Sequence, residues 1–190
     1  MTPPDGIGEL EGAGFEGFLT IGQLHSSSCL DVPNERGVYV VLTRSDAPHA
    51  FRVRSSAPVW RGKDPAVAVE ELAEQWVPGA TVLYVGRARG PGVRARLRQR
   101  IKRYLRFGHG RVVGAWAGRL IWQLAEVSRL VVAWRVSGGD EDPADVEARL
   151  LLEFEARHGA LPFANLRGET DGDEDEVKTT GSAAGEPSCD

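Results

Sequence analysis

The chain has 190 residues, of which 42% are hydrophobic, and its formal net charge is −4. This length suits one globular domain with a sizeable core, and the negative total taken alone argues against a generic nucleic-acid binder. No apolar run approaches membrane-spanning length, and the first residues lack the features of a signal peptide. The two cysteines, Cys29 and Cys189, lie far apart, which argues against a disulfide framework or a zinc cluster. We therefore expect a cytoplasmic protein with no membrane partner.

The charge is unevenly distributed along the chain. Residues 79–136 contain 13 basic and 1 acidic side chains, a local charge of +12, whereas residues 169–190 contain 1 basic and 8 acidic side chains. The basic region indicates a polyanionic partner despite the negative total. The acidic segment has almost no apolar residues, so we expect a disordered tail that is either solubilising or competes with the polyanion. A flexible N-terminus is expected over residues 1–17.

Periodic patterns predict the secondary structure between these ends. Capping residues and apolar spacing predict helices over residues 21–28, 65–76, 93–107 and 142–158. Apolar and β-branched runs predict strands over residues 38–42, 82–85, 120–124 and 130–136. The long connection over about residues 45–80 is interpreted as a structured insertion between the first two strands. The chain is thus predicted to form one domain over residues 18–168.

Residues 82–106 carry most of the positive charge of the central region. A strand containing Tyr84 stops at Gly86, a Gly/Pro turn follows, and an arginine-rich helix comes next. Arg100 lies one turn before Tyr104, on the boundary of the predicted buried face, from where it can still reach a ligand. The turn is not a phosphate-binding P-loop, because the GK[ST] ending is missing. A tyrosine strand beside such a helix suggests phosphate chemistry.

The motif residues resemble those of a known family. Gly37-Val38-Tyr39 and Tyr84-Val85-Gly86 resemble the paired strands of the GIY-YIG nuclease superfamily, and VLYVGRAR followed by LRQRIKRYLR is similar to the nuclease domains of bacterial excision-repair incision subunits. The later run LLLEFEARHGALPFAN resembles the last helix and exit loop of the family. The similarity covers about residues 36–165, with a longer gap between the two tyrosines than in compact members. It implies an α+β fold with a small, mostly antiparallel sheet flanked by helices.

The resemblance also implies an activity and a set of site residues. Members are divalent-metal-dependent endonucleases, so DNA is the expected partner, Mg²⁺ or Mn²⁺ the expected cofactor, and no organic cofactor is expected. By position, Tyr39 corresponds to the general base, Tyr84 to the second strand tyrosine, and Arg100 to the arginine that contacts phosphate. Glu153 corresponds to the metal ligand, and Asn165, twelve residues later, to the asparagine of the exit loop. A single carboxylate suits one Mg²⁺ that keeps several of its waters.

Several alternatives remain open at this level. Either tyrosine alone is equally well explained as a core residue, Glu147 is a rival metal ligand, and Arg94 or Arg96 could replace Arg100 at the phosphate. The candidate DNA contacts, which share a position near the second tyrosine strand or on the basic helix, are Arg87, Arg89, Arg96, Lys102 and Arg103. The alternative function is a nucleic-acid-binding module that keeps the fold but has little or no catalysis.

Overall fold

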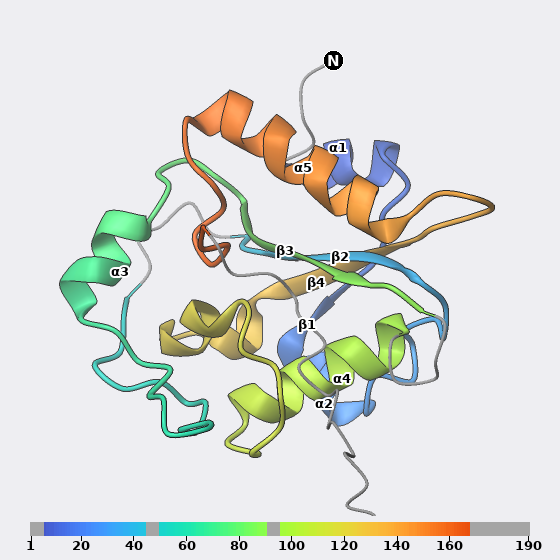
Figure 1. Ribbon diagram of the computed structural model, residues 1–190. Helices are drawn as coiled ribbons and strands as arrows, with labels where there is room; N and C mark the ends of the chain where they lie inside the picture. Colours follow the sequence, from blue (N-terminus) through green and yellow to red (C-terminus); the bar gives the residue numbers. More distant parts are fainter. Residues whose placement is uncertain (1–5, 45–49, 91–95, 168–190) are drawn as a thin grey trace, which may run out of the picture.

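The computed structural model describes residues 6–44, 50–90 and 96–167 (Figure 1). It is an α+β fold with a four-stranded antiparallel sheet, which confirms the predicted fold class. The sheet order is β1-β4-β2-β3, and the strands span Glu16–Thr20 (β1), Gly37–Leu42 (β2), Val82–Ala88 (β3) and Val131–Val136 (β4). The helices are α1 (Ile7–Gly12), α2 (Ile21–Ser26), α3 (Val69–Gln75), α4 (Leu97–Gly108) and α5 (Pro143–His158). Two 3₁₀ helices, η2 (Arg119–Gln123) and η3 (Val127–Arg129), precede β4.

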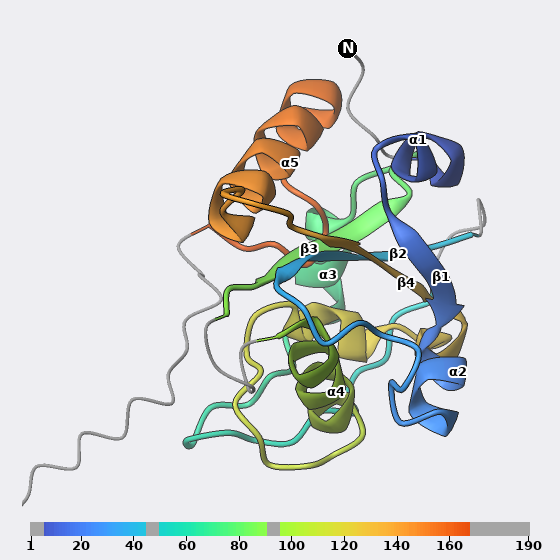
Figure 2. The same ribbon diagram turned by 90° about the vertical axis from the view of Figure 1, so that its right-hand side faces the viewer.

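The elements form three layers, with the sheet in the middle (Figures 1 and 2). Helices α1 and α5 cover one face of the sheet, and α2 and α4 lie on the other face together with the 3₁₀ helices. The alternation of side chains along a strand assigns each residue to a face. In β2, Val38, Val40 and Leu42 pack beneath α5, whereas Tyr39 and Val41 pack beneath α4. The second face therefore receives the tyrosine of the first motif.

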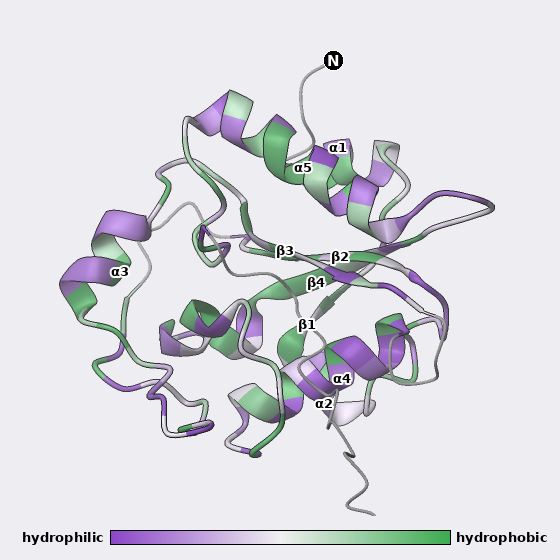
Figure 3. Cartoon of the chain, in the orientation of Figure 1, coloured by the Kyte–Doolittle hydropathy of each residue, from purple (hydrophilic) through white to green (hydrophobic). Residues whose placement is uncertain are grey.

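Helices α4 and α5 are positioned by their own sequences. In α5, Asp142 accepts a hydrogen bond from the Ala144 N–H, Pro143 opens the first turn, and Gly159 ends the helix with a φ of 74°. Helix α4 buries an apolar stripe against the sheet and exposes a hydrophilic outer side (Figure 3). The predicted helices over 93–107 and 142–158 are therefore confirmed within about one turn, although residues 91–95 lie outside the described part.

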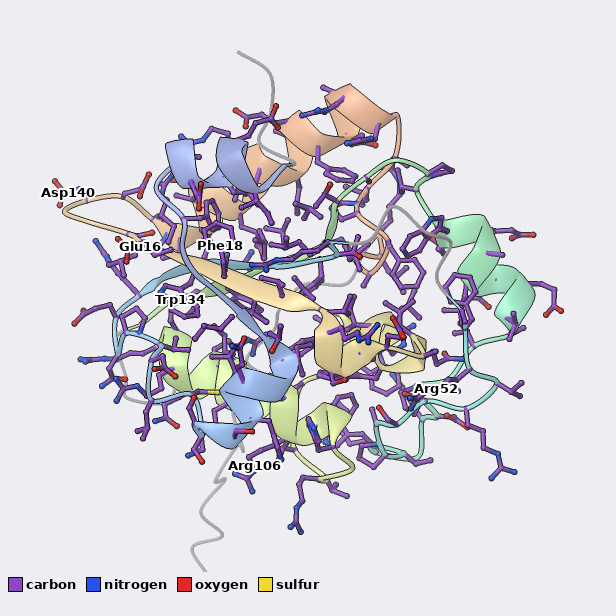
Figure 4. All side chains as sticks on the ribbon, turned by 180° about the vertical axis from the view of Figure 1, so that it is seen from behind. Glu16, Phe18, Arg52, Arg106, Trp134 and Asp140 are labelled. Carbon is purple, nitrogen blue, oxygen red and sulfur yellow. The ribbon has the colours of Figure 1, made fainter. Side chains whose placement is uncertain are left out.

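The outer edge of the sheet was not predicted. Residues 6–17, expected to be flexible, form α1 and the start of β1. Leu10 and Phe15 are buried against the face of the sheet that α5 covers. Strand β1 pairs with β4, and Figure 4 shows Glu16 and Phe18 beside Trp134. Gly17 has a φ of 93°, and the Trp134 ring occupies the space of its missing side chain. The short polar segment was therefore folded by tertiary contacts that its composition does not reveal.

The predicted strand over residues 120–124 is wrong. This segment is the 3₁₀ helix η2, with backbone hydrogen bonds from the Ile121 N–H to Gly118 O and from the Leu124 N–H to Ile121 O. Every residue from Leu120 to Leu124 is buried, so the run is apolar without the alternation that distinguishes a half-buried strand. The insertion does contain the predicted helix, but α3 is shorter than expected. No helix in the described ranges has the length and apolar character needed to cross a membrane.

Candidate active site at the edge of β3

The three tyrosines of the chain lie together on the α4 face of the sheet. The Tyr39 and Tyr84 ring centroids are 6.0 Å apart at 63°, and the Tyr84 and Tyr104 rings stack at 5.7 Å and 16°. Tyr39 comes from β2, Tyr84 from β3 and Tyr104 from α4, and the Tyr104 hydroxyl donates to Gly118 O at 2.9 Å. All three are at most 2% exposed. The structure thus brings the two predicted tyrosines together and adds a third.

Two glycines make room for this cluster. Gly86 is paired with Tyr39 across β2 and β3, and a Cβ added there would lie 2.7 Å from Cζ and 2.8 Å from Oη of Tyr39. Gly118 has a φ of 75°, and a Cβ there would lie 3.0 Å from the Tyr84 ring. The glycine of the second motif is therefore required because the Tyr39 ring crosses it. This requirement gives a physical reason for pairing the two motifs.

Arg100 lies on α4, one turn before Tyr104. It is 7% exposed and is the buried charged residue of α4. Burial of an arginine is costly unless it is paired, which makes this position unusual for a residue that only solvates a helix. The position agrees with the predicted boundary location of Arg100, whereas Arg94 lies outside the described residues.

A cavity of about 210 Å³ opens at the edge of β3, beside the tyrosine cluster. Its polar lining comes from Tyr84 and Arg87 of β3, Glu147 of α5 and Asn165 of the exit loop. Ala117 and Gly118 of the loop before η2 close the side nearest Tyr104. The cavity therefore combines groups from both faces of the sheet at β3, one of its two edge strands.

Glu147, the rival ligand, lies in this cavity. Its Oε2 pairs with the Nη1 of Arg87, and the two side chains are 9% and 10% exposed. Glu153 is half-buried on α5 and is not among the residues that line the cavity. Arg157, one helical turn after Glu153, pairs with Glu9 of α1, so that flank of α5 faces α1 and not β3. The structure groups Glu147, and not Glu153, with the tyrosine strand.

Asn165 closes the free edge of β3. Its Oδ1 accepts from the Val85 N–H at 2.9 Å, its Nδ2 donates to Val85 O at 2.8 Å, and the Ala164 N–H donates to Leu83 O at 2.9 Å. The side-chain amide therefore reproduces the pairing of a neighbouring strand, one residue after Tyr84. Asn165 therefore holds the exit loop against β3 beside the cavity, a position compatible with the role expected for it.

The basic residues divide into held and exposed groups. Arg87 is held by Glu147, and Arg96 donates through Nη1 to Asn34 O at 2.9 Å. Arg89 is exposed and lines a different hollow, of about 630 Å³, near the start of α5. Lys102 and Arg103 are half-buried on α4. Of the predicted DNA contacts, only Arg87 lines the cavity, and Arg89, Arg96, Lys102 and Arg103 do not.

The described residues offer a limited set of metal ligands and nucleophiles. No group of three or more His, Cys, Asp or Glu side chains that could hold a metal ion occurs within these ranges. A hydrated Mg²⁺ needs only one or two carboxylates, so Glu147, the carboxylate that lines the cavity, is enough to meet that requirement. Burial raises the pKa of the Cys29 thiol to about 11, so this cysteine stays protonated at neutral pH and is no nucleophile.

Comparison with protein-family models, with curated proteins and with solved structures finds no match to this chain. The site residues therefore rest on the sequence resemblance and on the geometry above.

Sequence reasoning gave Glu147 less weight than its position deserved. Glu147 follows the buried Val146 and precedes Leu150 and Leu151 by three and four residues, which places it on the arc of α5 that faces the sheet. The twelve-residue spacing between Glu153 and Asn165 outweighed this signal. Tyr104 was predicted to face the sheet, but nothing in the sequence showed that its ring would stack on Tyr84.

Proposed function

We propose that the protein is a divalent-metal-dependent endonuclease that hydrolyses phosphodiester bonds in DNA, with its active site at the edge of β3. The observation that carries this proposal is the shared cavity of Tyr84, Arg87, Glu147 and Asn165 beside the Tyr39 ring. Phosphodiester hydrolysis needs an activated water, a cation for the developing oxyanion and a proton for the leaving oxygen. The residues around the cavity can supply each of these groups. The proposal keeps the cytoplasmic location expected from the sequence.

The tyrosines activate and position the attacking water in this proposal. Tyr39 is the general base in the resembled family, and here its hydroxyl lies over Gly86, where a Cβ would otherwise stand 2.8 Å away. Tyr84 and Tyr104 stack beside it, so the three rings hold one another in fixed orientations. Fixed rings position a phenolic oxygen without the entropic cost of ordering it at each turnover.

The charged residues serve the phosphate. Arg100, buried on α4, is the candidate phosphate contact, and Arg87 is the guanidinium that lines the cavity. Glu147 replaces Glu153 as the proposed metal ligand, because Glu147 is the carboxylate that lines the cavity. A bound Mg²⁺ or Mn²⁺ supplies positive charge for the developing oxyanion. The Arg87 pair orients the Glu147 carboxylate before such an ion binds.

The test is nicking of a supercoiled plasmid by the purified full chain. We expect relaxation of the plasmid in Mg²⁺ or Mn²⁺ and none in EDTA. Tyr39→Phe should lower the rate by about a hundredfold or more if its hydroxyl is the base, since general-base catalysis contributes roughly that factor. DNA binding without any metal-dependent nicking would instead support the binding module, for which the buried Arg87–Glu147 pair is the favouring observation.

A further inference from the structure

Two segments, one of which includes the cavity-lining Ala117 and Gly118, lie side by side and are joined by hydrogen bonds (Figure 1). They are residues 50–63 of the insertion and residues 109–123, which lead from α4 through η2. The Ser56 N–H donates to Trp122 O at 3.0 Å, and the Arg52 N–H donates to Gln123 O at 2.7 Å. The Gln123 side chain also exchanges two hydrogen bonds with the backbone of Val67. The insertion is therefore held to this segment at Arg52 and again at Val67. These contacts fix the relative position of the surface side chains that the two segments carry.

Each segment places one half-buried tryptophan on this surface. The Trp60 and Trp116 ring centroids are 6.3 Å apart, and the ring planes differ by 30°. The Arg61 Cζ lies 4.4 Å from the Trp60 centroid, and the Arg119 Cζ lies 4.8 Å from the Trp116 centroid. We call these four residues the tryptophan platform. Each guanidinium lies over its indole, so its outer side can act as a further stacking surface, and Arg61 itself is exposed.

The surroundings of the platform are basic and apolar at once. Residues 50–63 contain four Arg or Lys and no acidic side chain, and residues 109–123 contain two arginines and no acidic side chain. On the same segments, Val53 is 80% exposed and Val112 is 71% exposed. Aromatic rings, arginines and a positive field together are the features of surfaces that bind single-stranded nucleic acid. An acidic protein partner would match the charge but not the two neighbouring indoles.

The platform adjoins the candidate active site through the chain itself. Trp116 and Arg119 flank Ala117 and Gly118, the two residues that line the cavity with Tyr84 and Glu147. DNA bound on the platform would therefore lie beside residues that line the cavity. The insertion supplies Trp60 and Arg61, half of the platform, and so has a role that the smaller predicted fold does not explain.

We propose that the tryptophan platform binds unstacked bases of single-stranded DNA next to the bond that is cut. This inference rests on the proposed function for its placement beside a cleavage site, and it makes DNA with unpaired segments the preferred substrate. In a duplex the base faces are already stacked, so only phosphates can meet the platform. Unpaired bases can stack on Trp60, Trp116 and the two guanidinium planes while the basic residues follow the backbone.

The experiment measures binding and not cleavage. The anisotropy of a fluorescein-labelled thymidine oligonucleotide is compared with that of a hairpin of equal length whose two arms are fully paired and joined by a non-nucleotide linker, using the full chain in EDTA. Wild type should bind the single strand more tightly than the hairpin. Trp60→Ala and Trp116→Ala should each weaken single-strand binding by about 5- to 100-fold, as loss of one stacking partner does. Binding to the hairpin should change by less than about twofold, because it uses phosphate contacts.

Matched variants separate stacking from folding and from charge. Trp60→Phe keeps an aromatic face and should restore most of the affinity that Trp60→Ala loses. Trp76→Ala is the control, since this half-buried indole packs on Phe51 and Phe163 and should leave single-strand binding unchanged. Arg61→Lys keeps the charge but removes the guanidinium plane, so it should weaken single-strand binding without changing the salt dependence.

The outcomes are decisive in either direction. Unchanged single-strand affinity in folded Trp60→Ala, or equal losses on single strand and hairpin, would overturn the platform. If Trp60→Ala does not fold, Trp116→Ala and Arg61→Lys decide by the same comparison. A wild-type protein that never nicks DNA, but whose platform variants lose single-strand binding selectively, would refute the proposed nuclease and leave the platform standing.

Discussion

The two faces of the sheet are built from different kinds of side chain. Beneath α5 the strands contribute mainly aliphatic residues, such as Val40 and Ala133, and the helix adds Val146 and Phe154. Beneath α4 lie the three tyrosines, Trp122 and the buried Arg100. An aliphatic face only needs to exclude water, whereas hydroxyl and guanidinium groups need fixed partners. The α4 face therefore gathers the tyrosine hydroxyls and a buried arginine, whereas the face beneath α5 is mainly an apolar packing surface.

The edge of β3 is the exception that joins the two faces. Arg87 and Glu147 bring a buried charged pair to the mainly apolar side, and Tyr84 reaches the same cavity from the other side. Asn165 seals the strand between them. The candidate site therefore arises because an edge strand can present both of its faces to one cavity. Three sets of variants test this comparison. The first changes the charged pair, the second changes the tyrosine face, and the third changes the edge of β3.

The largest stability effect is expected at the charged pair. Arg87→Met or Glu147→Leu alone should lower the free energy of unfolding by about 3–5 kcal/mol, because each leaves a buried charge unpaired. The double variant should return to within about 1 kcal/mol of wild type or exceed it, because an apolar pair suits this face. Urea unfolding followed by circular dichroism measures all three. A double variant as unstable as the singles would show that the pair is needed for folding and is no mark of function.

A smaller loss of stability is expected when a side chain is added at Gly86, against the Tyr39 ring. Gly86→Ala places a Cβ 2.7 Å from the Tyr39 ring, so the ring must move, at a cost of about 1–3 kcal/mol. Gly138→Ala is the control, since nothing lies within 4 Å of its added Cβ. Urea midpoints of the two variants are compared at equal slope. Equal stability of both would mean that Tyr39 does not depend on the glycine of the second motif.

The smallest loss of stability is expected when Asn165, which pairs with the free edge of β3, is replaced. Asn165→Ala removes two hydrogen bonds to Val85 and should cost about 1–2 kcal/mol, because water can replace part of the pairing at an edge. Asn165→Asp keeps the acceptor and loses the donor, so its loss should be intermediate. Amide hydrogen exchange at Val85 reports the broken bond directly. Unchanged protection of that amide in Asn165→Ala would contradict the seal.

The fold could be predicted where the chain repeats a pattern and not where tertiary contacts decide. Strand β2 and helix α5 follow from an apolar run and from the caps Asp142 and Gly159. Strand β1 could not be predicted, because its five residues pair with β4 through a tight approach at Gly17 that leaves no periodic signal. The apolar run of η2 was misread for the opposite reason, since a segment buried on all sides loses its period.

The candidate site shows the same limit. The resemblance located Tyr39, Tyr84, Arg100 and Asn165, and the structure places two of them, Tyr84 and Asn165, at one cavity. Spacing along the sequence could not tell which face of α5 a glutamate occupies, because one helical position changes its direction by about 100°. The stacking of Tyr104 and the two tryptophans depends on how distant segments pack, which no local pattern records.

The most direct test of the central claim compares two glutamates of the same helix. Glu147→Gln and Glu153→Gln are the same chemical change on α5, and the glutamine at 147 can still accept a hydrogen bond from Arg87. Metal-dependent plasmid nicking is measured for both, with folding checked by circular dichroism. The account predicts a loss of about a hundredfold or more for Glu147→Gln and a rate within about twofold of wild type for Glu153→Gln. The reverse order, or full activity in Glu147→Gln, would contradict an active site at the edge of β3.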